Sequence, residues 1–144
     1  TESFGTIVAE VAHVAVSPEG KLRVRHVFAV VDCGDVVNPD SATAQVEGGI
    51  IFGLSAAMLG EITIAEGRVV ERNFRDHQMI HMADAPDISA EFIRSGAPLG
   101  GLGEPCVPPI AAAVTNAIFA ATGIRVRELP IKKQDLSRRA TTTT

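Results

Sequence analysis

The sequence predicts an α+β fold, a mixed sheet of short strands with two main helices. Three observations support this: an alternating apolar segment near the N-terminus, two helical segments with clear boundary signals, and the mixed order of strands and helices. With 144 residues, 46% hydrophobic and 21% charged, the chain has the balance of one globular domain. We expect residues 1–140 to form a single segment and residues 141–144 a disordered tail.

The first third of the chain is typical of a β-hairpin. Residues 6–16 form an apolar strand candidate, and residues 17–20 supply turn chemistry through Pro18 and Gly20. The second strand alternates apolar and charged residues with a period of two. We expect His26 there to be a core histidine with a hydrogen-bond partner rather than a ligand or proton carrier. The predicted apolar face consists of Leu22, Val24, His26, Phe28 and Val30.

Two segments have the signals of helices. Asn38 can cap a helix whose first residue is Pro39, and the periodicity extends this helix over about 38–59. A second helix is predicted over 109–122, ending at Gly123. The core-facing residues expected are Val46, Ile50, Leu54, Ala57 and Met58 in the first helix and Val114, Ala117, Ile118 and Ala121 in the second.

The other segments give weaker signals. We expect a short hairpin from 61–64 and 68–71, a strand over 88–94 and a last strand over 126–131, with a loop over 95–109. Residues 73–86 have no clear assignment. The chain begins without Met and enters a strand pattern almost at once, as a processed or excised piece of a longer protein, or a shortened chain, would do.

Charge and composition exclude several classes of protein. The net charge is -4 and no basic stripe is present, so the sequence does not predict nucleic-acid binding. No apolar run reaches the roughly 18 residues of a membrane span. Lys132–Lys133 and Arg138–Arg139 are expected to belong to a solvated tail rather than to a docking patch. Cys33 and Cys106 are expected to be buried free thiols.

The first helix carries a candidate ligand platform. Gln45, Gly48, Gly49 and Phe52 are neighbours at three- and four-residue spacing, beside the core stripe. Each glycine destabilises a helix by roughly 1 kcal/mol relative to Ala, which suggests that something approaches the backbone closely. Two interpretations stay open: close packing of the helix on the sheet, or a platform on which Gln45 hydrogen-bonds the edge of a heterocycle.

A second candidate is the glycine-rich segment 100–105, with Glu104 between Gly103 and Pro105. Glycine permits close approach and proline fixes the exit, so this carboxylate is expected on a constrained turn. An apolar setting would raise the pKa of Glu104 and make it a usable proton acceptor. The other interpretation is that Glu104 is an exposed loop carboxylate or a charge at the start of a helix. No phosphate-binding pattern occurs here.

The remaining reactive side chains give no strong motif. His77 and His81 have the spacing of a helical zinc pair, but Gln78 stands where the usual glutamate would be, and we predict no metal site. Cys106 lies close to Glu104 and beside prolines, which favours a structural thiol over a nucleophile.

Five blocks together resemble the end of the large subunit in the xanthine dehydrogenase/aldehyde oxidase family. Within that family the chain is most similar to isoquinoline 1-oxidoreductase and bacterial aldehyde dehydrogenase large subunits, from about residue 6 to residue 131. The blocks are Val31-Asp32-Cys33-Gly34 with Val37-Asn38-Pro39-Asp40, Gln45-Val46-Glu47-Gly48-Gly49 with Phe52-Gly53-Leu54, Gly101-Leu102-Gly103-Glu104-Pro105, residues 116–123 and residues 125–130.

The resemblance implies a molybdenum hydroxylase that oxidises an aldehyde or an N-heterocycle with oxygen derived from water. Glu104 would be the catalytic base acting on the molybdenum-bound hydroxyl, Gln45 would hydrogen-bond the cofactor, and Gly103 would bring backbone close to it. The implied cofactor is a molybdenum–pterin, with its cytosine dinucleotide form as one alternative. The implied partners are the remainder of the large subunit and an iron–sulfur electron-transfer subunit.

The chain also departs from this family. The family's large subunit is several times longer, so we expect no turnover from this chain alone. His77 and His81 stand where Tyr and Arg are expected in the closest relatives. Two other hypotheses remain: a non-catalytic interaction or regulatory module that retains the scaffold, and a domain that binds a small anionic ligand.

Overall fold

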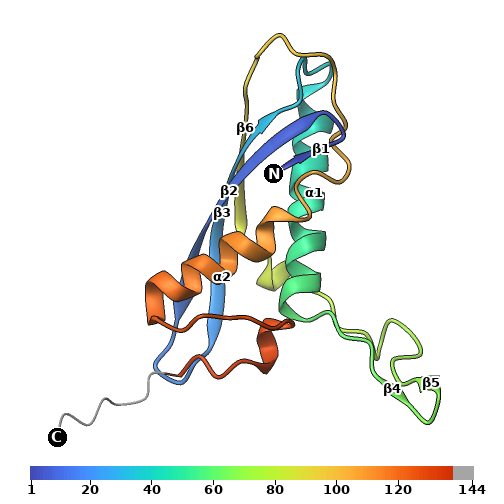
Figure 1. Cartoon of the computed structure of the whole chain (residues 1–144), viewed down its shortest axis with the longest axis vertical. Helices are drawn as coiled ribbons and strands as arrows, with labels where there is room; N and C mark the ends of the chain where they lie inside the picture. Colours follow the sequence, from blue (N-terminus) through green and yellow to red (C-terminus); the bar gives the residue numbers. More distant parts are fainter. Residues whose placement is uncertain (138–144) are drawn as a thin grey trace, which may run out of the picture.

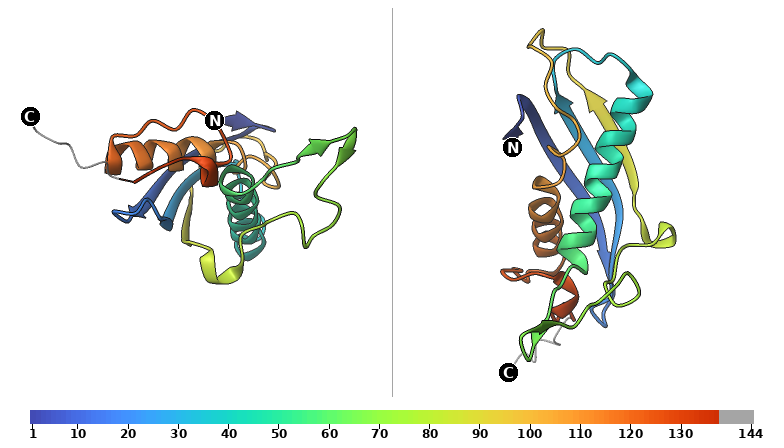
Figure 2. Two further views of the ribbon diagram at one scale, coloured as in Figure 1. Left: turned by 90° about the horizontal axis from the view of Figure 1, so that it is seen from below. Right: turned by 90° about the vertical axis from the view of Figure 1, so that its right-hand side faces the viewer.

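The computed structural model describes residues 1–137, and in them a four-stranded sheet is covered on one face by two helices (Figures 1 and 2). The sheet has the order β1 (Glu2–Ser3), β2 (Thr6–Val16), β3 (Leu22–Asp32) and β6 (Asp87–Phe92). β1 and β3 both run antiparallel to β2, whereas β6 runs parallel to β3. The helices are α1 (Pro39–Met58) and α2 (Pro109–Thr122). The predicted α+β fold with a mixed sheet is confirmed.

Both helices begin and end where the local signals place them. The side chain of Asn38 accepts a hydrogen bond of 2.9 Å from the Ser41 N–H, which caps α1. Gly123 ends α2 with a φ of 75°, and its N–H donates to the Phe119 carbonyl at 2.8 Å. The core stripe of α1 is as predicted, but Ala121 of α2 is exposed. The buried residues of α2 are Ile110, Val114 and Ile118.

The predicted apolar face of β3 is wrong beyond Val24. β2 and β3 pair His13 with His26 and then Val14 with Val24, so Arg25 is an extra residue in β3 that bulges out of register. Side chains alternate with a period of two, and one extra residue therefore exchanges the two faces of the strand. Phe28 is 48% exposed, while the residues that enter the core are Val27, Ala29 and Val31.

His26 consequently lies at the outer face of the sheet rather than in the core. It is half-buried, and its Nε2 lies 2.8 Å from the Ser89 hydroxyl of β6. Its ring stacks on Phe28 with 4.1 Å between centroids. The expectation that His26 has a hydrogen-bond partner is confirmed, but the expected location is wrong.

The short elements differ from prediction in extent. The hairpin is smaller, with β4 (Ile64–Ala65) and β5 (Arg68–Val69), and it projects away from the sheet (Figure 1). The predicted strand over 126–131 is absent from the described chain, where only a 3-10 turn, η2 (Ile131–Lys133), follows α2. Pro130 cannot donate to a strand ladder, which disfavours pairing there. A second 3-10 turn, η1 (Met82–Asp84), precedes β6.

Lys132 and Lys133 are solvent-exposed, as predicted, but they lie in the turn η2 with an ion-pair partner rather than in a tail. The Nζ of Lys132 lies 3.8 Å from one carboxylate oxygen of Glu61, and Lys133 bonds to the other. These contacts fix the turn η2 against the segment that follows α1. Arg138, Arg139 and the predicted tail 141–144 lie outside the described residues.

The apolar interior joins the sheet to both helices. Val8, Val27 and Val31 of the sheet pack in one cluster with Ile50 of α1 and Val114 of α2. Cys33 and Cys106 belong to this cluster as free thiols, which confirms the prediction for both. None of the helices in residues 1–137 is long and apolar enough to span a lipid bilayer.

The glycines of α1 allow a paired test of its packing. A Cβ at Gly53 would lie 2.5 Å from the Val107 carbonyl oxygen, so we expect Gly53→Ala to destabilise the fold by about 1–3 kcal/mol. A Cβ at Gly48 would meet nothing within 4 Å, and Gly48→Ala should stabilise by about 0.5–1 kcal/mol. Urea unfolding of the two variants measures this difference; equal effects would contradict the packing described here.

Candidate functional site

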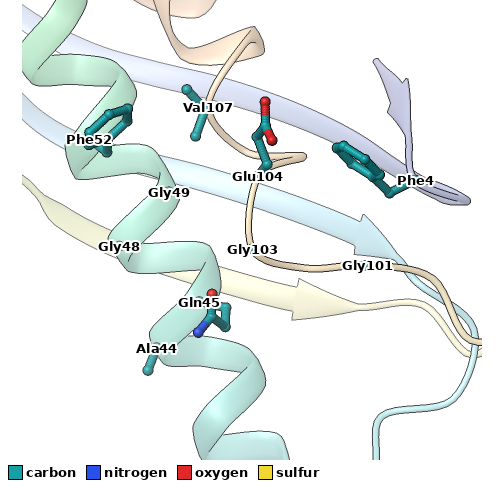
Figure 3. A pocket seen from close by; sticks show the side chains of 10 residues that line it. All are labelled: Phe4, Ala44, Gln45, Gly48, Gly49, Phe52, Gly101, Gly103, Glu104 and Val107. Atoms are coloured by element: carbon teal, nitrogen blue, oxygen red, sulfur yellow. The ribbon is translucent and has the colours of Figure 1, made fainter.

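A pocket of about 760 Å³ lies between α1 and the segment 101–107 (Figure 3). One wall is the exposed side of α1, and the other is the glycine-rich loop that leads into α2. Both candidate groups from the sequence line it. The lining residues are Phe4, Ala44, Gln45, Gly48, Gly49, Phe52, Gly101, Gly103, Glu104 and Val107.

The glycines of α1 serve two different purposes. A Cβ on Gly49 would lie 3.4 Å from the Cβ of Cys106, and Gly53 has no room for one at all, so these two permit close packing of the loop. Gly48 has open space on its side of the helix and lines the pocket. Gly49 and Gly53 therefore agree with the interpretation of close packing, and Gly48 agrees with that of a ligand platform.

Hydrogen bonds to its backbone hold the loop against the start of β2 and the end of β3. The Gly101 N–H donates to the Phe4 carbonyl at 2.9 Å, and the buried hydroxyl of Thr6 donates to the Gly101 carbonyl at 2.6 Å. The Gly100 N–H donates to the Cys33 carbonyl at 2.9 Å. A Cβ at Gly100 would lie 2.3 Å from the Thr6 hydroxyl oxygen, so only glycine fits there.

Glu104 lies on a tight turn whose base is buried. The Val107 N–H donates to the Glu104 carbonyl at 2.8 Å, and Pro105 and Cys106 are both buried beneath it. The Glu104 side chain itself is exposed at the pocket. The constrained turn is as predicted, but the apolar enclosure expected around the carboxylate is not formed by residues 1–137.

Gln45 and Gly103 meet across the pocket. A Cβ on Gly103 would lie 3.6 Å from the Gln45 Oε1, so the absence of a side chain keeps this gap open. Gln45 is exposed, and its amide has no hydrogen-bond partner within the described part of the chain. The structure thus brings Gln45, Gly103 and Glu104 to one pocket, while their roles stay predictions.

This pocket fits a flat polar heterocycle. The backbone of Gly48 and Gly103 leaves space beside the Gln45 amide, which can both donate and accept a hydrogen bond. Phe4 and Phe52 add exposed apolar surface at its rim. A pterin ring is flat and has hydrogen-bond donors and acceptors along its edge. The residues that line the pocket are therefore compatible with the cofactor that the sequence suggests.

The other sequence candidates do not join this pocket. His77 and His81 line a different hollow at the far end of α1, together with Asp84. No group of three or more His, Cys, Asp or Glu side chains that could hold a metal ion forms within residues 1–137. Burial raises the pKa of the Cys106 thiol to about 12, and this supports a structural role for it.

Some site residues were missed from the sequence. Phe4 and Val107 line the pocket, but neither belongs to a motif. Glu10, which does not line the pocket, was also missed: both of its carboxylate oxygens are buried without a hydrogen-bond partner in residues 1–137. A signal for Glu10 exists in the sequence, because it alternates with Val8 and Ala12 on the side of β2 that faces the helices.

Known proteins with similar sequences are much longer than this chain. A membrane-bound aldehyde dehydrogenase [pyrroloquinoline-quinone] of Gluconacetobacter polyoxogenes is 37% identical over 119 residues, which cover 83% of this chain and 15% of that protein. The isoquinoline 1-oxidoreductase subunit beta of Brevundimonas diminuta is 36% identical over 114 residues, covering 79% of this chain and 15% of that subunit.

Solved structures show the same fold. The aldehyde oxidoreductase from Desulfovibrio desulfuricans superposes with a TM-score of 0.75 at 26% identity, and covers 87% of this chain and 14% of that one. Residues 1–86, more than half of the chain, match the family described as "Molybdopterin cofactor-binding domain". The chain therefore belongs to the molybdopterin cofactor-binding domain family, which confirms the resemblance seen in its sequence.

Proposed function

We propose that this chain is one part of a molybdenum hydroxylase that oxidises an aldehyde or an N-heterocycle with oxygen derived from water. One observation carries the proposal: an exposed carboxylate, Glu104, and an exposed amide, Gln45, line a single glycine-walled pocket in a chain of this family. Relatives named for aldehyde and isoquinoline oxidation support the substrate class.

The side chains of this pocket have separate tasks in the proposed reaction. The molybdenum–pterin group, when bound, would supply the redox change by accepting the hydrogen of the substrate carbon together with the two electrons of the C–H bond. Gln45 orients the cofactor through its amide, and Gly103 leaves room for close approach of the backbone. Glu104 accepts a proton on a carboxylate oxygen as the water-derived oxygen attacks the carbon.

The rigid turn beneath Glu104 makes this proton transfer effective. The carboxylate must be held within hydrogen-bond reach of the oxygen whose proton it accepts, since small displacements lower the rate steeply. The buried Pro105 and Cys106 and the bond from Val107 to the Glu104 carbonyl restrain the backbone. The backbone from which the Glu104 side chain projects therefore needs little reorganisation during the reaction.

We propose that other polypeptide completes the site. Residues 1–140 would form one segment of a larger cofactor-binding domain, because the chain spans 15% of the relatives' length and its pocket is open to one side. The sequence has two cysteines and no iron–sulfur pattern, so electrons would leave through an iron–sulfur partner chain. The pterin would be carried in its plain or cytosine dinucleotide form.

Replacement of the proposed base tests the reaction. In the complete enzyme, Glu104→Gln should lower kcat/KM by about 10²–10⁴-fold with unchanged molybdenum content, because the amide cannot accept the proton. Glu47→Gln is the matched control, since Glu47 is also exposed but does not line the pocket. Unchanged turnover of Glu104→Gln with aldehydes and N-heterocycles would refute the assignment; tighter binding of inorganic phosphate would favour an anion-binding domain.

The proposed role of Gln45 predicts a loss of cofactor rather than of chemistry. Gln45→Ala should weaken cofactor binding, and so lower pterin and molybdenum retention, about fivefold for each hydrogen bond lost, because hydrogen bonds of this kind contribute about 1 kcal/mol each. Metal analysis and pterin fluorescence after gel filtration measure the retention, with Glu47→Ala on the same helix as the control. One relative's name specifies pyrroloquinoline quinone. Stoichiometric quinone without molybdenum would therefore argue against the proposed cofactor.

A further inference from the structure

The side-chain carboxyl group of Glu10 is buried without a hydrogen-bond partner among residues 1–137. It lies on β2 between Val8 and Ala12, on the side that faces the helices. Both of its carboxylate oxygens are inaccessible to solvent and have no hydrogen-bond partner among the described residues. Burial raises the pKa of Glu10 to about 7, and the charge of the Thr1 amino group lowers it.

The surroundings of Glu10 offer one further titratable group. Its direct neighbour on β3 is Ala29, and α2, which packs across β2, has no titratable side chain. From the loop, Cys106 interacts with Glu10. Burial raises the pKa of the Cys106 thiol to about 12, and the charge of Glu10 contributes to this rise. Among residues 1–137, the terminal amino group is therefore the only positive charge that lowers the pKa of Glu10.

The loop that carries Glu104 is attached to β2 at two places. At its start, the Thr6 hydroxyl bonds the Gly101 carbonyl. At its end, Cys106 lies close enough to Glu10 for their charges to interact, and these two strand positions are roughly 13 Å apart along an extended strand. On its other side Cys106 packs against Gly49 of α1. Cys106 also belongs to the same buried cluster as Val8 and Ala12, the residues on either side of Glu10 on the inner face of β2.

We propose that Glu10 is a positioning residue for the catalytic turn: its neutral, protonated form supports Cys106 from beneath, and its ionisation loosens the turn that carries Glu104. An isolated charge among Val8, Ala12 and Cys106 would be strongly unfavourable without hydrogen bonds. Ionised Glu10 would therefore draw water between β2 and the turn, and the buried Pro105–Cys106 segment would have to move to admit it.

The direction of the pH dependence follows from linkage. The pKa of Glu10 is 4.5 when unperturbed and about 7 in the fold, so the folded state binds its proton more tightly than the unfolded state. The stability from protonated Glu10 is fully present below 4.5 and is lost as the pH rises through about 7. A permanently neutral side chain of the same shape would avoid this loss.

Glu10→Gln provides this neutral side chain. Above pH 7 the variant should have a higher Tm than the wild-type chain, and the difference should shrink as the pH falls towards 4.5. Glu91→Gln is the matched control, because Glu91 is an exposed carboxylate on β6 of the same sheet. A Tm difference between Glu10→Gln and wild type that does not change with pH would overturn the proposal.

Hydrogen exchange locates the effect on the turn. After correction for intrinsic rates, the Val107 amide that bonds the Glu104 carbonyl should lose protection above pH 7 in the wild type but keep it in Glu10→Gln. Amides of η2 should show no such difference between the two proteins. Equal pH dependence at Val107 in wild type and variant would show that Glu10 does not control the turn.

A direct titration keeps the proposal testable if Glu10→Gln fails to fold. Carbon-13 NMR of the wild-type chain labelled at the glutamate carboxyls should show one group titrating near 7, and a full set titrating near 4.5 would contradict the proposal. The inference rests on the proposed function only for the role of Glu104. All three measurements use the chain without cofactor, so they can succeed even if the hydroxylase assignment fails.

Discussion

The close approach of the loop 100–107 to α1 and to the start of β2 is the constraint on which the pocket depends. A Cβ at Gly53 would overlap the Val107 carbonyl, and a Cβ at Gly100 would overlap the Thr6 hydroxyl. These two glycines let backbone pack on backbone at both ends of the loop. Because the loop is closely packed at both places, the exposed Glu104 side chain projects from a restrained backbone into the pocket that Gln45 also lines.

The helix α1 provides both a closely packed base for the pocket and the open space of the pocket itself. On α1, Gly49 and Gly53 face the loop and pack against it, while Gly48 faces the pocket and leaves it empty. Each glycine weakens the helix, yet the cap at Asn38 and the buried residues Ile50 and Leu54 hold it in place. The pocket thus combines a well-packed base with a polar, open surface, which suits the binding of a rigid cofactor by this family.

The sequence predicts those features that depend on local signals. The Asn38 cap and Gly123 define the helix ends, and the motif around Glu104 identifies its turn correctly. The sequence does not predict features that depend on contacts between distant segments of the chain. The extra residue Arg25 is visible only once β2 and β3 are aligned, and the exposure of Glu104 depends on which polypeptide surrounds the turn. The sequence alone could not reveal that no hydrogen-bond partner among residues 1–137 reaches the Glu10 carboxylate.

The bulge at Arg25 lets β3 carry one more residue than β2 while Val24 and Val27 both face the helices. Loss of Arg25 would remove the bulge and keep this alternation, whereas loss of a single residue from 27–31 would exchange the two faces of the strand beyond that point. The loop between β4 and β5 has no such constraint, since its glycine, Gly67, has no neighbouring atoms within 4 Å of a Cβ. Insertions and deletions among descendants of this sequence should therefore accumulate in the small hairpin, and a deletion within β3 should be tolerated only at the bulge.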